Sequence, residues 1–196
     1  WFISNGYTTN RVNWYFQQFL KLNAYTLTES KYFVVWDGDT IPLSKIELIN
    51  RKLNNVIFKI RPTKEYHQPY FDTNNKLIGL KKIKKYSFIS EYAVIDSKIC
   101  EKLISEIKKI SNSPWYINIL NQINSKDVEY SGFSEYELLG NYQVKNGVDY
   151  EFFYGKSLRR ASSYFGKSVD LRTLEFLKKY YLFVSYENWG VSSPIT

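Results

Sequence analysis

Apolar side chains recur at helical spacing in several parts of the chain. Between Trp14 and Ala24, apolar residues fall at roughly helical spacing, which predicts a helix. Those at this spacing are Trp14, Tyr15, Phe19, Leu20 and Leu22. Pro, Asp or Ser stands at the start of several similar segments, where a helix commonly begins. The further predicted helices run over residues 42–53, 96–110, 115–123, 132–143 and 169–180.

Short unbroken apolar runs predict strands. The run from Tyr32 to Trp36, YFVVW, is typical of a strand that is buried on both faces, as in a parallel sheet. The other predicted strands cover residues 56–60, 87–95 and 182–186, whereas residues 61–85 lack clear periodicity and are predicted to form a long loop. Because strands alternate with helices, we predict one α/β domain over residues 1–196, with a mostly parallel sheet flanked by helices.

Composition narrows the class of protein. The chain has 196 residues, of which 44% are apolar and 23% charged, as in ordinary globular domains and unlike disordered or collagen-like chains. No apolar run approaches the roughly 18 residues needed to span a bilayer. The single Cys excludes an internal disulfide and fits a reducing compartment. The sequence contains no Met, so we expect a processed product or an excised piece.

The formal charge of +8 comes mainly from Lys. Lys, Asn, Ile, Tyr and Phe share A/T-rich codons, so genome composition accounts for much of this excess. We therefore expect no nucleic-acid partner, although a nucleic-acid-binding module stays as an alternative that rests on charge alone. The remaining charge suits an anionic substrate or a membrane surface.

Two carboxylates follow the predicted strand 32–36. Residues two apart in an extended segment point the same way, so Asp37 and Asp39 can aim at one point. Carboxylate oxygens suit Mg²⁺ or Mn²⁺, ions that complete their shell with water and substrate phosphates. The carboxyl end of a strand is also where ligands bind in open α/β sheets. A solvated Asp-Gly-Asp turn is the alternative interpretation.

A second acidic pair lies in the segment SGFSEYELLG. Ser134 and Glu137 match the capping box S-x-x-E, which predicts that the Glu137 carboxylate returns to the backbone at its own helix start. The carboxylate of Glu135 would then be freer, kept ionised by the helix dipole, and able to act as a general base. An ordinary acidic first turn is the alternative.

Other polar side chains are weaker candidates for ligand contacts. Gln17 and Lys21 are four residues apart and share a helix face, with Gln18 beside them, so they could bind a polyhydroxy or phosphate ligand. A solvated helix face explains the same pattern. The sole His, His67, lies in the predicted loop, and Arg159–Arg160 could hold a phosphate.

Five segments combine these features in a fixed order: WYFQQFLKL, YFVVWDGDTIPL, SFISEYAVIDSKI, SGFSEYELLGNY and VSYENW. This ordered set resembles a family of bacterial glycosyltransferases catalogued as a domain of unknown function. The family is of the GT-A type, with a Rossmann-like nucleotide-sugar fold and a D-x-D motif, and is linked to capsule or lipopolysaccharide synthesis. The resemblance runs from Trp14 to Trp189.

The resemblance implies a metal-dependent transfer of a sugar from a nucleotide-sugar donor to a glycan or lipid-linked acceptor. Asp37 and Asp39 match the D-x-D and would hold Mn²⁺ or Mg²⁺ against the donor diphosphate. Glu135 is the expected base if the reaction inverts the anomeric centre, and Glu137 belongs to the same S-E-Y-E segment. A cytoplasmic protein that associates peripherally with the inner face of the membrane is implied as well.

The resemblance also implies contacts to the donor. Gln17, Gln18 and Lys21 match a Q-Q-x-x-K helix, and Trp36 and His67 are the further expected substrate contacts. Family members often carry a His near the position that Glu91 or Tyr92 occupies here, and this chain has none. The dozen residues before Trp14 are too few for the strand and loop that open a GT-A domain, so we expect the first β-α unit to be missing.

Two alternatives remain besides the nucleic-acid-binding module. A haloacid-dehalogenase-like phosphatase also ends an apolar strand in D-x-D, with the first Asp as nucleophile and the second as acid/base. Such enzymes usually have Thr or Val at the fourth place after the first Asp, where this chain has Ile41. The other alternative is a non-catalytic carbohydrate-binding domain, such as a degenerate transferase.

Overall fold

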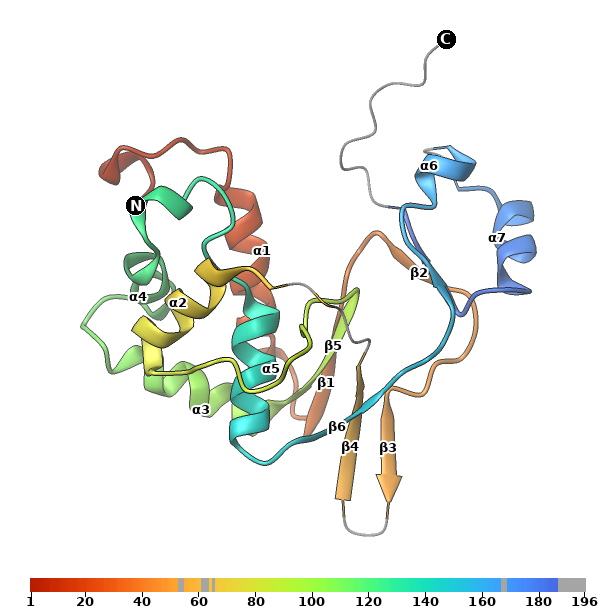
Figure 1. Ribbon diagram of the computed structural model, residues 1–196, viewed down its shortest axis with the longest axis horizontal. Helices are drawn as coiled ribbons and strands as arrows, with labels where there is room; N and C mark the ends of the chain where they lie inside the picture. Colours follow the sequence, from red (N-terminus) through yellow and green to blue (C-terminus); the bar gives the residue numbers. More distant parts are fainter. Residues whose placement is uncertain (53–54, 61–63, 65, 167–168, 187–196) are drawn as a thin grey trace.

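The computed structural model describes residues 1–186 except 53–54, 61–63, 65 and 167–168. Helices α1 to α5 gather at one end, strands β1 and β5 cross the middle, and α6 and α7 lie at the opposite end (Figure 1). The helices are α1 Val12–Asn23, α2 Gln68–Ile78, α3 Ser97–Lys108, α4 Trp115–Gln122, α5 Glu135–Lys145, α6 Ser162–Phe165 and α7 Leu171–Lys178. The described residues contain no helix long and apolar enough to cross a membrane.

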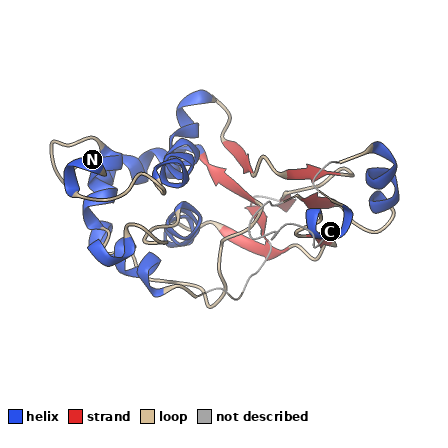
Figure 2. Cartoon of the chain, turned by 90° about the horizontal axis from the view of Figure 1, so that it is seen from above, coloured by secondary structure: helices blue, strands red, loops and turns tan. Residues whose placement is uncertain are grey.

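The strands form three small sheets, which a second view shows between the two groups of helices (Figure 2). They are β1 Tyr32–Trp36, β2 Thr40–Pro42, β3 Ile49–Lys52, β4 Asn55–Ile60, β5 Tyr92–Asp96, β6 Asp149–Phe152, β7 Ser157–Leu158 and β8 Phe183–Ser185. The orders are β1-β5, β2-β8-β7 and β3-β4-β6. The α/β class is therefore confirmed.

The expected mostly parallel sheet is not what the described strands form. The pairs β1·β5, β2·β8 and β3·β4 are antiparallel, and only β4·β6 and β7·β8 are parallel. Burial on both faces of β1 was also wrong, because Val34 is 43% exposed while Val35 is 8% exposed. An unbroken apolar run does not by itself reveal which face meets the core.

Several predicted helices and strands are confirmed, with ends that shift by one or two residues. These are α1, β1, β4, α3, α4, α7 and β8. Helix α3 begins where the sequence indicated, since the Asp96 carboxylate accepts hydrogen bonds from the backbone N–H groups of Lys98 and Ile99. Its inner face, with Leu103, Ile104 and Ile107, is fully buried in the main core.

Three segments differ from the prediction. The segment 42–53, predicted as a helix, contains the end of β2 and then β3, because Ile49 pairs with Phe58 across an antiparallel ladder. The predicted loop 61–85 contains α2. Its buried face includes Thr73 and Asn74 beside apolar residues, so polar positions conceal the helical periodicity. The predicted strand 87–95 is reduced to β5.

Close packing at the middle of α5 yields a stability prediction. A Cβ added at Gly140 would lie 2.1 Å from Cγ of Phe88, so the ring must move to admit a methyl group. We expect Gly140→Ala to lower the free energy of unfolding by about 1–3 kcal/mol through overpacking, despite a gain of about 1 kcal/mol in helix propensity. Urea unfolding measures the change. Phe88→Ala removes the three ring atoms nearest the added Cβ, so Gly140→Ala should cost less in a Phe88→Ala background than in the parent. A Gly140→Ala variant as stable as the parent would contradict the packing argument.

Candidate active site

A polar cavity of about 520 Å³ opens where the end of β1 meets helices α1 and α5. The loop before β5 and the segment after β7 complete its wall. Its lining includes four acidic and three basic side chains. The charged residues are Arg11, Lys21, Asp37, Asp39, Glu91, Glu135 and Arg159.

Lys21 is the centre of the site. Its Nζ lies 2.7 Å from Oδ1 of Asp37 and 3.0 Å from Oε1 of Glu135. It also donates to the Tyr136 hydroxyl at 3.0 Å, and that hydroxyl donates to Oδ1 of Asp37 at 3.1 Å. One ammonium therefore joins α1, the end of β1 and the start of α5. The Lys21 side chain is 14% exposed and that of Glu135 only 5%.

The local sequence brings these groups together through two helix rules. Gln18 and Lys21 are three residues apart on α1 and so share one face. Ser134 caps α5, its Oγ accepting from the backbone N–H of Glu137. Gln18 Oε1 accepts from the backbone N–H of Glu135 at 3.0 Å, which satisfies another free amide of the same helix end.

The amide group of Gln18 also presents an unpaired donor to the cavity. The residue is buried and lines the cavity, yet its Nε2 has no hydrogen-bond partner. Its Oε1 is committed to Glu135, so the amide group cannot turn over without losing that bond. A buried donor without a partner is costly, which favours a ligand oxygen at this point of the cavity.

For both Glu135 and Lys21, burial and the neighbouring opposite charge shift the pKa in opposite directions. Burial raises the pKa of the Glu135 carboxyl above its ordinary value, against the attraction of Lys21. Burial acts to lower the pKa of the Lys21 ammonium, but Glu135 and Asp37 outweigh this, and its pKa is raised. Lys21 is thus a permanent cation, whereas Glu135 is suited to accepting a proton nearer to neutral pH than an exposed Glu.

Asp37 and Asp39 both line the cavity. The segment that carries them is a turn and not the expected extended chain, because the backbone N–H of Thr40 donates to the carbonyl of Asp37 at 3.0 Å. One oxygen of Asp37 is occupied by Lys21 and Tyr136. Among the described residues, no group of three or more His, Cys, Asp or Glu side chains is arranged to hold a metal ion. Two carboxylates fit Mg²⁺ or Mn²⁺ only when a substrate supplies further oxygen ligands, as a diphosphate does.

Sequence reasoning did not assign Glu91 to the site. It is buried before β5, lines the cavity, and lies with Oε1 3.4 Å from Nε of Arg159. Its backbone carbonyl accepts from the N–H of Asp37 at 2.9 Å. Arg159, suggested as a phosphate ligand by sequence, reaches the same cavity, but Arg160 is not part of its lining. The family resemblance drew attention to the position of Glu91 or Tyr92, but no local pattern assigns the Glu91 carboxylate a role, because the pairing of β1 with β5 brings it to the cavity.

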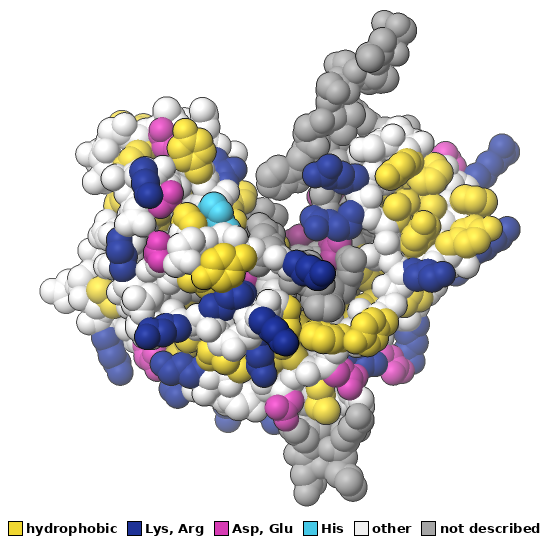
Figure 3. Space-filling view, in the orientation of Figure 1, with side chains coloured by type: hydrophobic (Ala, Val, Ile, Leu, Met, Phe, Trp, Pro, Cys, Tyr) yellow, Lys and Arg dark blue, Asp and Glu magenta, His cyan; other side chains and the backbone are white. Residues whose placement is uncertain are grey.

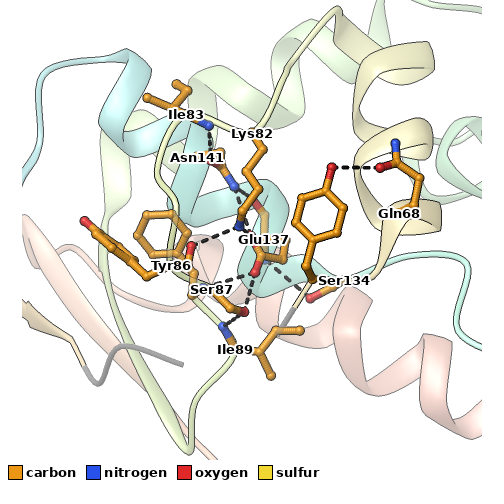
Figure 4. A network of polar contacts seen from close by, with 11 residues as sticks. Gln68, Lys82, Ile83, Tyr86, Ser87, Ile89, Ser134, Glu137 and Asn141 are labelled. Carbon is orange, nitrogen blue, oxygen red and sulfur yellow. Dashed lines mark hydrogen bonds and ion pairs between the residues drawn. The ribbon is translucent and has the colours of Figure 1, made fainter. Parts of the chain in front are cut away.

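The Glu137 carboxylate lies outside the cavity, in a structural network (Figure 4). It accepts hydrogen bonds from the Ser87 hydroxyl, from the backbone N–H of Phe88 at 3.1 Å and from Asn141 Nδ2 at 3.0 Å. Lys82 Nζ lies 3.7 Å away. The predicted capping box is therefore only half formed, and a catalytic role for Glu137 does not fit its position.

Of three other residues expected to contact the substrate, one lines the cavity and two do not. Gln17 lines the cavity on the exposed side of α1. Trp36 does not; its Nε1 donates to the Thr40 carbonyl at 2.7 Å and its ring stacks on Tyr92. His67 is also outside, with Nε2 2.8 Å from the Ser131 carbonyl oxygen. For these two residues the structure indicates packing roles in place of the expected substrate contacts.

Comparison with known proteins identifies one family. The model described as "Family of unknown function (DUF6492)" matches residues 7–155, more than half of the chain. This range includes α1, β1 and α5, and thus most of the cavity. No curated protein and no solved structure matches the chain.

The Lys21 cluster yields a pH-dependent prediction. Lys21→Met leaves two carboxylates without their cation, which should cost about 3 kcal/mol of stability at pH 7. The Glu135 pKa is already raised by burial, and the variant raises it further. Because ionising such a group in the folded state costs stability above the unfolded pKa of about 4.3, the loss should shrink as the pH falls toward 4.

Urea unfolding at pH 7 and at pH 4 measures this difference. Lys45→Met is the matched control, since Lys45 and Glu47 are exposed and 4.0 Å apart, and its effect should stay below about 1 kcal/mol. A Lys21→Met loss that is the same at both pH values would show that lost packing, not the unpaired carboxylates, is responsible.

Proposed function

We propose that this chain, which belongs to DUF6492, a family of unknown function, transfers a sugar from a nucleotide-sugar donor to a glycan or lipid-linked acceptor. The observation that carries the proposal is the meeting of Asp37, Asp39 and Glu135 in one polar cavity. The proposal includes a GT-A-like arrangement of the fold, in which the D-x-D follows strand β1 at the cavity edge.

The cavity suits a ligand with phosphates and hydroxyls. Its volume of about 520 Å³ falls within the usual range for small-molecule sites. Arg11 and Arg159 are on its wall, where guanidinium groups can pair with phosphate oxygens. The unpartnered Nε2 of Gln18 is a donor for a ligand oxygen. These features support a phosphorylated sugar more than an apolar ligand.

Asp37 and Asp39 are the residues that would hold Mn²⁺ or Mg²⁺. Bound with the donor, such an ion would neutralise charge on the leaving nucleoside diphosphate. Asp37 would keep Lys21 on one oxygen, and the rest of its carboxylate would face the ion. Lys21 then fixes the direction of the Asp37 side chain, so that the pair needs little reordering when the donor arrives.

Glu135 is the proposed general base of an inverting transfer. The acceptor hydroxyl oxygen forms a bond to the anomeric carbon while the bond from that carbon to the diphosphate oxygen breaks. The hydroxyl proton passes to Glu135, and the leaving group departs with the bonding electrons. Burial favours this role because it raises the pKa of the carboxyl and so makes it a better proton acceptor.

Binding of donor and metal gives the first test. We expect a nucleotide sugar with Mn²⁺ to raise the thermal unfolding temperature more than either ligand alone, since stabilisation follows ligand concentration relative to affinity. Asp39→Asn should abolish the part that depends on metal. Asp72→Asn, which changes an acid of α2 outside the cavity lining, is the control and should keep the full shift.

Assays of phosphate release, glycan binding and turnover on the same protein separate the alternatives. Release of phosphate from a generic phosphomonoester, without stabilisation by any nucleotide sugar, would favour the phosphatase that uses Asp37 and Asp39. Binding of a glycan with no turnover and no metal dependence would favour a degenerate transferase.

Turnover gives the second test. We expect Glu135→Gln to lower kcat by about 10²- to 10⁴-fold, with little change in the donor KM. In the parent enzyme the rate should rise with pH as Glu135 loses its proton, at a pKa above that of an ordinary Glu, and this limb should vanish in Glu135→Gln. Glu101→Gln, on the exposed surface of α3, should retain both the parental rate and its rise with pH. A Glu135→Gln enzyme with the parental pH profile would exclude Glu135 as the base.

A further inference from the structure

Aromatic side chains are exposed together at the end of the molecule that carries α6 and α7. Tyr164 is 72% exposed, Phe176 52% and Tyr180 56%. They border an apolar groove of about 550 Å³, which we call the aromatic groove. Its main lining residues are Leu158, Tyr164, Phe165, Phe176, Tyr180 and Tyr181. Figure 3 shows hydrophobic side chains gathered over this end of the molecule, with Lys and Arg around them.

The packing of α7 explains the exposure. Leu177 turns inward and joins Ala161, Val184 and Tyr186 in a small core that is separate from the main one. Phe176 and Tyr180 are four residues apart on the neighbouring face, with ring centroids 5.4 Å apart. Single exposed apolar residues are ordinary, but a contiguous aromatic surface marks an interaction site.

Positive charge is concentrated in the same region. Residues 154–186 contain seven Lys or Arg and two Asp or Glu, a balance of +5 out of the chain's +8. Lys178 and Lys179 are exposed at the end of α7, and Lys156 borders the aromatic groove. The Asp170 carboxylate caps the start of α7 by accepting from the backbone N–H of Thr173.

We propose that the aromatic groove and the lysines beside it dock the protein on an anionic lipid bilayer. Tyr rings suit the boundary between headgroups and acyl chains, because their hydroxyl stays wet while the ring is buried. Lysines extend charged ends toward anionic headgroups. A second copy is a poor occupant, since each copy would bring +5 to the same contact. This inference does not rest on the proposed function.

Vesicle co-sedimentation tests the docking. The full chain should bind vesicles of phosphatidylcholine with phosphatidylglycerol at least about tenfold more tightly than pure phosphatidylcholine. Raising the salt from about 0.1 M to 1 M should weaken the binding, as the Debye length falls from about 10 Å to 3 Å. Equal binding to the two kinds of vesicle, or binding to neither, would overturn the proposal.

Two variants locate the surface. Lys178→Glu with Lys179→Glu should weaken binding by about 25-fold or more, because each lysine near the surface contributes about fivefold and the two factors multiply. Phe176→Ser with Tyr180→Ser should weaken it on both kinds of vesicle. The matched controls are Lys108→Glu with Lys109→Glu, at the end of α3, and Tyr130→Ser, an exposed aromatic elsewhere. Controls that lose as much binding as the test variants would overturn the location.

The same variants also test for other occupants of the aromatic groove. Light scattering would show a dimer that Phe176→Ser with Tyr180→Ser converts to monomer if a second copy covers the groove. Binding of single-stranded DNA in preference to vesicles would indicate a nucleic acid. Either result would overturn docking on lipid. A thermal unfolding temperature close to that of the parent, measured without any ligand, would show that the surface variants keep the fold, and this control does not depend on the proposed function.

Discussion

The arrangement of the cavity depends on one buried cation. Lys21 places its ammonium between Asp37 and Glu135, and the Tyr136 hydroxyl completes its surroundings. These groups come from α1, from the end of β1, which lies close to α1 in the chain, and from α5, whose Tyr136 is 99 residues beyond Asp37. Removing Lys21 would leave two carboxylates without their cation in a mostly buried place, whereas removing either acid would leave Lys21 one partner. The ion cluster thus links the integrity of this part of the fold to the geometry of the site.

Glu135 and Glu137 show how one helix start serves two purposes. Side chains two apart on a helix differ in direction by about 200°, so the two carboxylates leave α5 on opposite sides. Glu135 faces the cavity and Lys21. Glu137 faces Ser87, Lys82 and Asn141, where it secures the loop that leads to β5 (Figure 4). Because that loop carries Glu91, the structural glutamate also helps to shape the cavity wall.

The two ends of the molecule differ in chemical character. The cavity is built on the helical end and contains acids and bases in nearly equal number. The opposite end, with α6 and α7, has its own small core, exposed aromatic rings and most of the net positive charge. Arg159 connects the two, since it follows β7 and forms an ion pair with Glu91 at the cavity. Glycosyl transfer to a lipid-linked acceptor would use both ends, one for the chemistry and one for contact with the bilayer.

The sequence by itself determined the local features. Periodicity located α1, α3 and α4, an apolar run located β1, and the S-x-x-E pattern placed Ser134 at a helix cap. The sequence also pointed to Asp37 and Asp39 as residues of the site, but it is a turn and not an extended chain that brings both to the cavity. Tertiary structure decided the strand directions, the strand β3 where a helix was expected, and the separation of Glu135 from Glu137. It also brought Glu91 and Arg159 to the cavity and removed Trp36 and His67 from it. Spacing acts within a turn or a strand, whereas these outcomes depend on which segments, distant in the chain, share a buried surface and on which charges must be paired there.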